Sequence, residues 1–433
     1  MGSSLSAEEN VIELPTFPTS HSTYGKVLQL LLLALATWGV TYGRFTLGSL
    51  QEAVRVNLSL TDDGMAWLQG PAIAVPMALG AIPFGLLVDR FSRAHLFLVF
   101  MALSLAATTT TALAPNLTLL FCARCLAGFA LAAILVAAYS MVADLYAPAQ
   151  RGRATMVVAI GEISGAPAAF ALGGVLLTLH NTGPAGWRWS LLWMSAVLLP
   201  VLLLMVTLRE PPRSQIVLKN PPLRDIWPQL WHYRAVIAPL MLARIMVWIA
   251  DGAVLIWAAP SLARRFALRP DRLGALMATA LLVSGILGPI LGGPLADLCQ
   301  RTGGPRRTAV ALGVLALLST PAALFAIMPS AGLAGLLLAG FLTIGYTIGT
   351  GAMTLSMIVI PGEVRGLYLG VTITVGALFF IGVAPLLVSS LSGALGGPGM
   401  IGLALTIVCG AASLLGAVAL IGGRRQFPRA LEL

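Results

Sequence analysis

The sequence predicts an all-α polytopic membrane protein, with about twelve transmembrane helices in two pseudo-symmetric six-helix bundles. Three observations support this fold class. First, 58% of the 433 residues are hydrophobic and only 10% are charged, whereas a soluble globular domain carries about 25% charged residues. Second, the apolar runs are continuous and match the roughly 20 residues that a membrane-spanning helix needs. Third, two motifs in the first half of the chain recur in the second half.

The length of the apolar runs distinguishes helices from a β-barrel. Only helices and closed barrels satisfy their backbone hydrogen bonds inside a bilayer. Barrel strands appear as segments of about ten residues with alternating hydrophobicity, and the runs here are longer and unbroken. Their predicted bounds are 25–53, 61–88, 95–113, 117–143, 152–179, 187–208, 233–263, 270–298, 307–328, 331–360, 364–391 and 398–423.

Polar connections divide the chain into five parts. The longest connection contains two Pro-Pro pairs and separates six spans from six. The predicted parts are a cytoplasmic N-terminal tail (1–24), an N-terminal bundle (25–208), a cytoplasmic inter-bundle linker (209–232), a C-terminal bundle (233–423) and a cytoplasmic C-terminal tail (424–433).

The basic residues lie mainly in short loops on one side of the predicted spans. If the N-terminus is cytoplasmic, 17 of the 26 Lys and Arg residues face the cytoplasm. This bias is typical of inner loops, so we expect both termini in the cytoplasm and a multi-pass protein of the plasma membrane, such as a bacterial inner membrane. The net charge of +10 reflects these loops, without the basic stripe that nucleic-acid binding requires. Six arginines on the outer side depart from the bias: Arg55, Arg188, Arg264, Arg265, Arg269 and Arg272.

Two motifs recur between the halves. Residues 85–93 and 293–301 share the pattern G-x-x-x-D-x-x-x-R, at an offset of 208 positions. A Pro-to-Arg-Gly pattern at 148–152 recurs at 361–366. The recurrence predicts homologous halves, the parallel repeat known in transporters. A binding site is then expected between the halves, near the bilayer midplane.

The first motif carries a family resemblance. Residues 85–93 resemble the signature of the major facilitator superfamily between its second and third helices, with departures at Ser92 and Ala94, where glycine and a basic residue are usual. Arg124 with Gly128 resembles the motif of the fourth helix. Residues 161–167, followed by a Gly-Gly pair, resemble the fifth-helix motif of antiporters with imperfect spacing. The resemblance implies the major facilitator fold and a transport function.

Within that superfamily the chain is most similar to spinster-like members. The similarity lies in 42–46, 124–128, 143–146, 187–189 and 209–212, and covers most of the first half. Two positions depart from it: Gly43 and Leu131 stand where acidic residues are usual. If those acids couple protons in the family, this protein uses others or none. The resemblance implies lysolipids or other amphiphiles as substrates.

Five ionisable residues lie deep inside predicted spans. An isolated charge there costs at least about 2.5–3.5 kcal/mol, so each is expected to face a water-filled cavity or a partner. All four histidines lie near span ends or in loops, which excludes a histidine relay at the membrane centre. The five residues are Arg44, Arg124, Glu162, Arg244 and Asp251.

The seventh span holds three of the candidate substrate-binding residues. Arg244, Trp248 and Asp251 are spaced i, i+4, i+7 and share one helical face. We interpret them as a stripe that binds a polar or charged substrate group. The alternative is an internal ion pair, although the two charges are roughly 10 Å apart along the axis and therefore have other partners.

Arg44 in the first span is a further candidate. The repeat offset maps it beside Asp251, so both are predicted to face one central cavity. A desolvated guanidinium favours bidentate contact with carboxylate or phosphate, and Tyr42 nearby is assigned to the same site. The alternative is a structural arginine that binds backbone carbonyls. Arg124 is assigned either to the cavity or to helix packing.

Glu162 and Asp251 are the candidate proton-coupling residues. Burial favours the neutral form of a carboxyl, so either group is suited to cycle a proton. The alternative for Glu162 is a pair with an arginine or with loop backbone. Seven aromatic residues either line the cavity or pack: Trp38, Tyr42, Tyr139, Trp257, Tyr346, Phe379 and Phe380.

The repeated motifs predict a conformational latch. A carboxylate at a helix end can bind a neighbouring helix N-terminus or a loop arginine, and glycines allow helices to approach closely. The alternative is that these charged residues only set the orientation of the helices in the membrane. The latch candidates are Gly85, Asp89, Arg93, Arg151, Asp297 and Arg365. Four residues are predicted to permit bending of the fifth span: Gly165, Pro167, Gly173 and Gly174.

These residues predict a secondary active transporter that moves a small anionic or amphiphilic organic substrate by alternating access, with protons as a candidate coupling ion. The alternatives are a drug or lysolipid exporter of spinster-like antiporter type and a non-transporting receptor or scaffold. No P-loop or H-E-x-x-H motif is present, and an enzyme is not expected. We expect a monomer among membrane lipids, with no nucleic acid, cofactor or metal; Cys122 and Cys125 are read as packing residues.

Overall fold

The computed structural model describes residues 23–180, 183, 185–211, 233–360 and 362–428. The side chains of 23–24, 81–82, 86, 89, 148–149, 362–367 and 369 are outside the described set. Most of the predicted linker and tails, and the side chains of the latch candidates Asp89 and Arg365, therefore lie outside the described residues.

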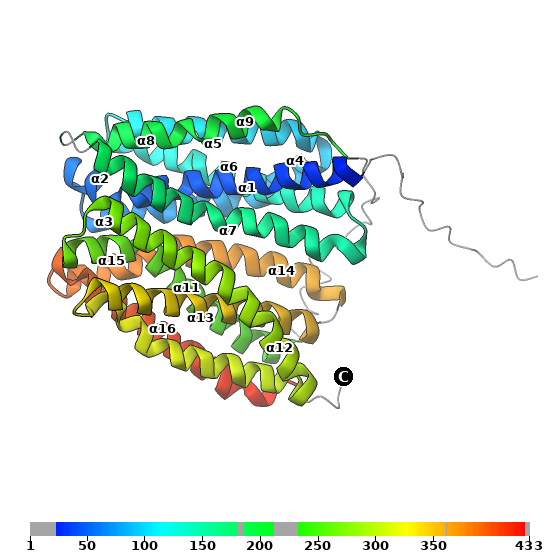
Figure 1. The fold of residues 1–433 in the computed structure, drawn as a ribbon. Coiled ribbons are helices and arrows are strands. Elements are labelled where there is room, and N and C mark those ends of the chain that lie inside the picture. Colours follow the sequence, from blue (N-terminus) through cyan, green and yellow to red (C-terminus); the bar gives the residue numbers. More distant parts are fainter. Residues whose placement is uncertain (1–22, 181–182, 184, 212–232, 361, 429–433) are drawn as a thin grey trace, which may run out of the picture.

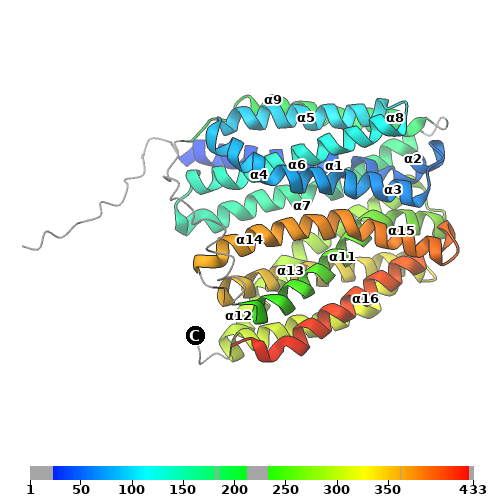
Figure 2. The same ribbon diagram turned by 180° about the vertical axis from the view of Figure 1, so that it is seen from behind.

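The N-terminal half of the chain forms one layer of helices and the C-terminal half forms another (Figures 1 and 2). The helices of the N-terminal half are α1 (Thr23–Ser49), α2 (Gln51–Asn57), α3 (Asp62–Gln69), α4 (Pro71–Arg90), α5 (Arg93–Leu113), α6 (Leu117–Leu145), α7 (Pro148–Leu179), α8 (Gly186–Ala196) and α9 (Leu198–Met205). Those of the C-terminal half are α11 (Arg234–Phe266), α12 (Pro270–Ala322), η1 (Ala323–Ile327), α13 (Ala331–Val359), α14 (Gly362–Gly376), η2 (Ala377–Val383), α15 (Ala384–Ala394), η3 (Pro398–Met400), α16 (Ile401–Gly422) and η4 (Gly423–Gln426).

The described helices account for twelve membrane crossings. Ten segments are long and apolar enough to span a bilayer, and one of them, Pro270–Ile327, has 58 residues. A straight helix of that length would measure about 87 Å, far more than the hydrocarbon core of about 30 Å. The chain instead turns at Gly304, whose φ of 69° and ψ of −166° only glycine adopts readily, and this gives two crossings. Helix α4 supplies the twelfth.

Local sequence signals set where several helices begin. Asn116 and Ser330 precede α6 and α13, and their side chains accept hydrogen bonds from the backbone N–H groups of Leu119 and Leu333. These N-caps satisfy donors that have no partner within the helix. Helices α4, α7 and α12 each begin with proline, which suits the first turn because its N–H is not needed there.

Glycines bring helix backbones into direct contact within each half. A Cβ atom on Gly165 of α7 would lie 2.6 Å from the backbone N of Tyr42 in α1. A Cβ on Gly128 of α6 would lie 3.0 Å from the Cα of Ile73 in α4. Helix α7 continues through Pro167 without interruption. The glycines predicted to allow bending of this helix thus also serve close packing, as small residues do between membrane helices.

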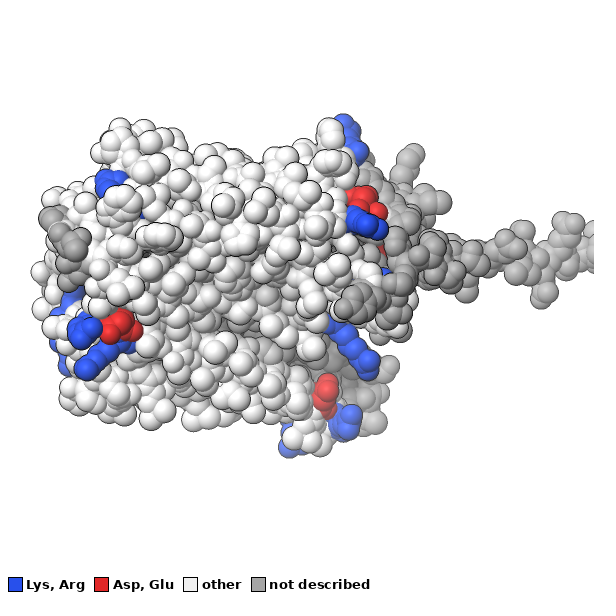
Figure 3. All heavy atoms as spheres, turned by 45° about the horizontal axis from the view of Figure 1, so that its top comes forward, with Lys and Arg blue, Asp and Glu red and all other residues white. Residues whose placement is uncertain are grey.

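The outer surface matches a bilayer environment. Figure 3 shows acidic and basic side chains at the two ends of the molecule and an uncharged zone between them. Large apolar side chains such as Leu336 and Val418 are 69% and 67% exposed there. Apolar surface on this scale is rare on soluble monomers. The molecule is therefore a multi-pass membrane protein.

Candidate functional site

Two ends of the molecule serve as reference points. The termini end is where α1 begins and α16 ends, and the far end is where α1 and α7 end (Figure 1). Between these two ends, side chains from both halves approach the seam. We call Arg44, Tyr139, Glu162, Tyr346 and Phe380 the central cluster.

The central cluster joins ionisable groups of the N-terminal half to aromatic residues of the C-terminal half. The guanidinium carbon of Arg44 lies 4.6 Å from the ring centroid of Phe45 and 5.5 Å from that of Phe380 on η2. Such contacts are attractive because the ring face is negative. Arg44 also interacts electrostatically with Glu162 and with Tyr346 on α13. Arg44 thus lies at the seam between the halves.

Glu162 has a close partner on a neighbouring helix. The hydroxyl of Tyr139 on α6 donates a 3.0 Å hydrogen bond to its Oε2. Tyr139 is 37% exposed, and Glu162 and Arg44 are partly accessible. These three polar side chains lie within membrane-spanning helices and remain at least partly accessible. The predicted alternative for Glu162 was a pair with an arginine or with loop backbone, and the electrostatic interaction with Arg44 fits the first of these.

Arg124 lies behind the central cluster and not in it. Its side chain is 1% exposed, and its Nη2 donates a 2.7 Å hydrogen bond to the backbone carbonyl of Arg44. A charge-assisted bond of this kind fixes the backbone that carries Arg44. Of the two predicted roles for Arg124, helix packing is the one seen in this conformation.

Tyr42 is also directed away from the seam. It is 1% exposed, its ring stacks on Trp38 at 4.9 Å between centroids, and its hydroxyl donates to the carbonyl of Met194 at 3.1 Å. It therefore joins α1 to α8 inside the N-terminal half. The helical period places Tyr42 and Arg44 about 200° apart around α1, so they cannot share one face.

Arg244 and Trp248 form a contact within α11. The Arg244 guanidinium carbon lies 5.0 Å from the Trp248 ring centroid, and its Nη1 lies 3.5 Å from the sulfur of Met353 on α13. Both side chains are partly accessible. They are available to a ligand between the halves, but neither has a contact with a described member of the central cluster.

Asp251 is enclosed within the C-terminal half. It is 6% exposed, and its Oδ1 has no hydrogen-bond partner among the described residues. A Cβ atom on Gly345 of α13 would lie 2.5 Å from this oxygen. Asp251 is therefore directed toward α13, where Tyr346 interacts electrostatically with both Asp251 and Arg44. The repeat offset placed the two at equivalent heights, but it does not determine the direction of each side chain around its helix.

Arg93, a latch candidate, forms a buried ion-pair network at the termini end. It is 2% exposed and lies 2.5 Å from Asp144 on α6 and 2.8 Å from Glu210. Burial raises the pKa of Glu210, but hydrogen bonds from Arg93, the Ala94 N–H and Ser92 outweigh burial and hold the pKa below its usual range. The network ties α5 to α6 and to the segment after α9.

The other described latch candidates have weaker contacts. Arg151 donates to the carbonyl of Tyr146 at 3.1 Å, and Asp297 is exposed. A Cβ atom on Gly85 or Gly293 would meet no atom within 4 Å. The close helix approach predicted at these two glycines is not present in this conformation.

The two halves touch closely at the far end. The backbones of α7 and α12 meet at Gly174 and Gly274, where a Cβ on either glycine would lie 3.0 Å from the Cα of the other. Further along, a Cβ on Gly285 of α12 would lie 2.6 Å from the side chain of Ile163 on α7. These approaches leave no path between α7 and α12 over this length.

Toward the termini end the same face of α7 loses its neighbour. Gly174, Ile163, Ile160 and Met156 fall within one narrow stripe at 100° per residue. Ile160 and Met156 are 58% and 57% exposed, although the stripe is in contact with α12 at Ile163 and Gly174. The halves therefore separate toward the termini end, and this conformation is closed at the far end.

An ion network spans the halves at the closed end. Arg264 of α11 binds Glu52 of α2 at 2.9 Å and Asp62 of α3 at 2.6 Å, and Arg55 binds Glu52 at 2.6 Å. Burial raises the pKa of Glu52, but hydrogen bonds from Arg55 and Arg264 outweigh burial and lower the pKa. We call Glu52, Arg55, Asp62 and Arg264 the far-end lock.

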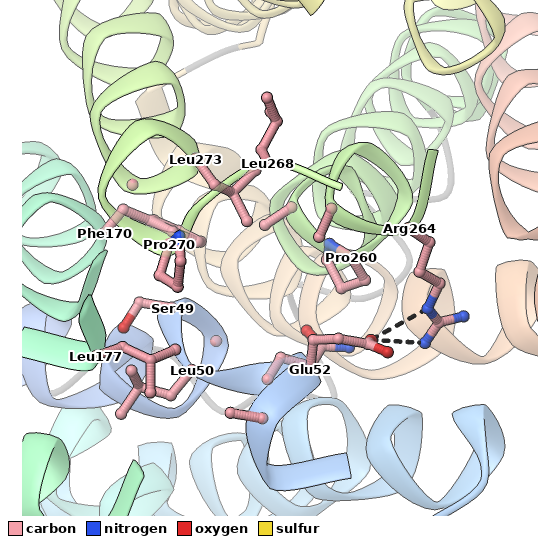
Figure 4. A pocket seen from close by; sticks show the side chains of 16 residues that line it. Ser49, Leu50, Glu52, Phe170, Leu177, Pro260, Arg264, Leu268, Pro270 and Leu273 are labelled. Atoms are coloured by element: carbon pink, nitrogen blue, oxygen red, sulfur yellow. Dashed lines mark hydrogen bonds and ion pairs between the residues drawn. The ribbon is translucent and has the colours of Figure 1, made fainter. Parts of the chain in front are cut away.

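A pocket of about 400 Å³ lies next to the far-end lock. Figure 4 shows Ser49, Leu50 and Glu52 from the N-terminal half opposite Pro260, Arg264 and Leu273 from the C-terminal half. Its lining includes none of the predicted substrate-binding residues. The pocket is a part of the far-end seam and is distinct from the central cluster.

The far-end lock explains part of the arginine excess that departed from the loop-charge bias. Arg264 neutralises acidic residues across the seam, and Arg265 donates to the carbonyls of Ile327 and Met328. Two sequence features indicated the lock: an outer loop rich in arginine, and acidic residues that follow the first span. Pairing the two needed the fold, because Glu52 and Arg264 are 212 positions apart.

We expect Arg264→Ala to shift the conformational equilibrium toward opening of the far end. Hydrogen bonds to charged groups contribute about 1.5–3 kcal/mol, so losing this arginine shifts the equilibrium roughly tenfold or more. Double electron–electron resonance measures the distance between spin labels at Val56 and Arg272, and a longer distance reports opening of the far end. The control is Arg265→Ala, whose bonds stay inside the C-terminal half. Equal distance distributions for both variants would show that the lock does not hold the end closed.

Comparison with known proteins places the chain in a family. Residues 33–385 match the model of the Major Facilitator Superfamily. In the bacterial homologue of the human lysosomal transporter Spinster, the inward-facing unoccupied structure has a TM-score of 0.76 at 20% identity, covering 94% of this chain and 98% of that one. The nucleoside transporter NupG has a TM-score of 0.71 at 15% identity, covering 92% and 99%. These likenesses confirm the predicted fold and the spinster-like similarity.

Curated relatives match shorter parts. The putative niacin/nicotinamide transporter NiaP of Bacillus subtilis (strain 168) is 25% identical over 191 residues, which are 42% of this chain and 45% of that protein. The antiporter QDR3 of Candida albicans (strain SC5314 / ATCC MYA-2876) is 31% identical over 125 residues, 28% of this chain and 17% of its own length. The chain thus matches less than half the length of either relative. With the family model covering most of the chain, twelve crossings and two packed halves, this protein belongs to the major facilitator superfamily.

Proposed function

We propose that this protein is a secondary active transporter that moves a small anionic or amphiphilic organic substrate by alternating access, with protons as the coupling ion. The observation that carries the proposal is Arg44 at the seam, opposite Phe380 and close to Glu162. A guanidinium beside an aromatic face suits a molecule with an anionic group and an apolar body. Similarity to NiaP, a putative niacin/nicotinamide transporter, supports niacin as a candidate substrate. The spinster-like resemblance of the sequence motifs implies amphiphiles as further candidates.

Competition for Arg44 supplies a coupling mechanism. When Glu162 is ionised, its charge attracts the Arg44 guanidinium, with which it interacts electrostatically. When Glu162 takes up a proton, the guanidinium is free to bind a substrate anion. Proton and anion then bind together, which gives symport. A cationic substrate would instead compete with the proton for Glu162, which gives the antiport expected of the exporter alternative.

The closed far end supports alternating access. The two halves are in contact there and separate toward the termini end. The loop-charge bias supports a cytoplasmic position of both termini in the plasma membrane, and we therefore propose that this conformation is inward-facing. Opening of the far-end lock together with closure at the termini end completes the cycle. We propose that the monomer performs it.

Transport by purified protein in liposomes tests the proposal. The probes are radiolabelled nicotinate and lysophosphatidylglycerol, each with and without a pH gradient. We expect saturable uptake that a pH gradient drives and that Arg44→Ala lowers at least about tenfold, as expected for loss of a charged hydrogen bond. Glu162→Gln keeps exchange of substrate but loses the response to the gradient.

Arg153→Ala serves as the control, because Arg153 is an exposed arginine near the start of α7. Uptake unchanged in Arg44→Ala would remove this residue from the substrate site. Absence of flux for both probes in the wild type would favour the receptor or scaffold alternative. A gradient that drives efflux in exchange for protons would favour the antiporter.

A further inference from the structure

The C-terminal half contains a small pocket whose lining includes none of the residues of the central cluster. It has a volume of about 20 Å³ and is lined by α11, α12, α13 and α16. A cavity needs at least about 10–15 Å³ to hold one water molecule. Its polar side chains are Asp251, Ser319 and Ser413, and the rest of its lining is apolar or glycine.

Asp251 is the only acidic side chain that lines this cavity. Asp251 is only 6% exposed, and its Oδ1 has no hydrogen-bond partner among the described residues. The hydroxyls of Ser319 and Ser413 are 2.8 Å apart and form a hydrogen bond with each other. A hydroxyl has one proton and two lone pairs, so the pair can still donate or accept a further hydrogen bond. The polar atoms therefore come from three different helices and converge on one small volume.

No described cation neutralises Asp251. The titratable groups near enough to interact with it are Tyr346 on α13 and Cys409 on α16, and neither is a cation. Arg244 on its own helix contacts Met353 and Trp248 instead. The facing part of α12 contributes Ser319, and η2 and α15 contain no titratable residue.

The site favours a proton over a metal cation. An ionised carboxylate without a partner is very costly in an apolar interior, and such a group is neutralised instead. A hard metal cation needs a shell of oxygen ligands, whereas this cavity offers one carboxyl and two hydroxyls. A neutral carboxyl needs only one acceptor for its proton, and one water held by the serine pair supplies it.

We propose that Asp251 is an occluded protonation site inside the C-terminal half, with one water bridging its carboxyl to the hydroxyls of Ser413 and Ser319. The site binds the proton away from the place where substrate binds. Binding of a proton at Asp251 in this conformation depends only on the packing of the C-terminal half. A role of this proton in driving transport rests on the proposed function.

Infrared difference spectroscopy of the purified protein tests the site without any substrate. The wild type is expected to show the carbonyl stretch of a protonated, buried carboxyl that exchanges slowly with D₂O. Asp251→Asn removes this band, and Ser413→Ala shifts it by removing a hydrogen-bonding partner. Ser284→Ala is the matched control, since Ser284 is fully buried and bonds only the carbonyl of Leu281 on its own helix.

Glu162→Gln identifies the band of the other carboxyl within the spans, so the two bands are not confused. If Asp251→Asn does not fold, the test is whether the carbonyl band shifts in Ser413→Ala and stays in place in Ser284→Ala. A spectrum that neither variant changes overturns the proposal, as does loss of the band when choline chloride is replaced by sodium chloride, which would assign the site to sodium. The spectrum is measured without substrate, so a negative transport assay does not contradict the protonation site.

Discussion

Gly174→Leu is expected to open the far end of the molecule. At this point α7 and α12 touch through backbone, and a Cβ on Gly174 would already contact the carbonyl oxygen and carbon of Pro270. Backbone atoms cannot rotate away as a flexible side chain does, so the halves must separate to admit the larger side chain. Overpacking costs typically 1–3 kcal/mol, which corresponds to a shift of roughly five- to 150-fold toward the opposite-facing conformation.

Spin-label distances between Val56 and Arg272 measure this shift. The control is Gly152→Leu on the same helix, because a Cβ at Gly152 would meet no atom within 4 Å and the residue is exposed. The melting temperature of Gly174→Leu should change less than its distance distribution, since each half keeps its own packing. A closed far end in Gly174→Leu, with normal folding, would show that close backbone contact at Gly174 is not required for closure of the far end.

Arg93→Ala is expected to destabilise the N-terminal half strongly. The substitution leaves the carboxylates of Asp144 and Glu210 without the guanidinium that lies 2.5 and 2.8 Å from them. Breaking a buried ion pair by removing one partner costs about 3–5 kcal/mol. For a half of this size we expect the melting temperature to fall by on the order of 10 °C.

Arg301→Ala is the matched control for this prediction. Arg301 is the repeat equivalent of Arg93, but it is exposed and no ion pair joins it to a described residue. Its substitution should change the melting temperature little. A similar loss in both variants would mean that the repeat position, and not the buried network, determines the effect.

The pH dependence of stability provides a second measure of the network. The pKa of Glu210 is lowered in the folded protein, so its contribution is present above its ordinary pKa and is lost as pH falls through the lowered value. Glu210→Gln should therefore melt below the wild type at neutral pH, and the difference should narrow in acid. A difference that stays constant with pH would contradict the role of the ionised carboxylate.

Sequence patterns predicted the helices well because a bilayer leaves few options. The span predicted at 117–143 is observed as Leu117–Leu145, and that predicted at 331–360 as Ala331–Val359. Agreement was lower where a span is interrupted: 61–88 is divided at Gly70 into α3 and α4, and 187–208 is divided at Val197 into α8 and α9. Hydropathy records how apolar a run is, and it does not record such local breaks.

Side-chain partners were predicted less well. Tyr42 and Asp251 were assigned to a central cavity, yet Tyr42 binds the carbonyl of Met194 and Asp251 is enclosed among α11, α12, α13 and α16. Helical period and repeat offset place residues at a height and a relative angle. The rotation of each helix in the bundle depends on packing against neighbours that are distant in sequence.

The amino-acid sequence alone determined that this chain crosses a membrane many times, that its halves repeat, and that a few ionisable residues lie within the apolar spans. These conclusions follow from composition and spacing, because burying backbone and charge in hydrocarbon is costly whatever the fold. Only the tertiary structure decided which of those residues meet. Arg44 faces Phe380, Arg264 meets Glu52, and Asp251 lines one pocket with Ser319 and Ser413. Helix rotation and glycine contacts, formed between distant segments, set the direction of each of these side chains.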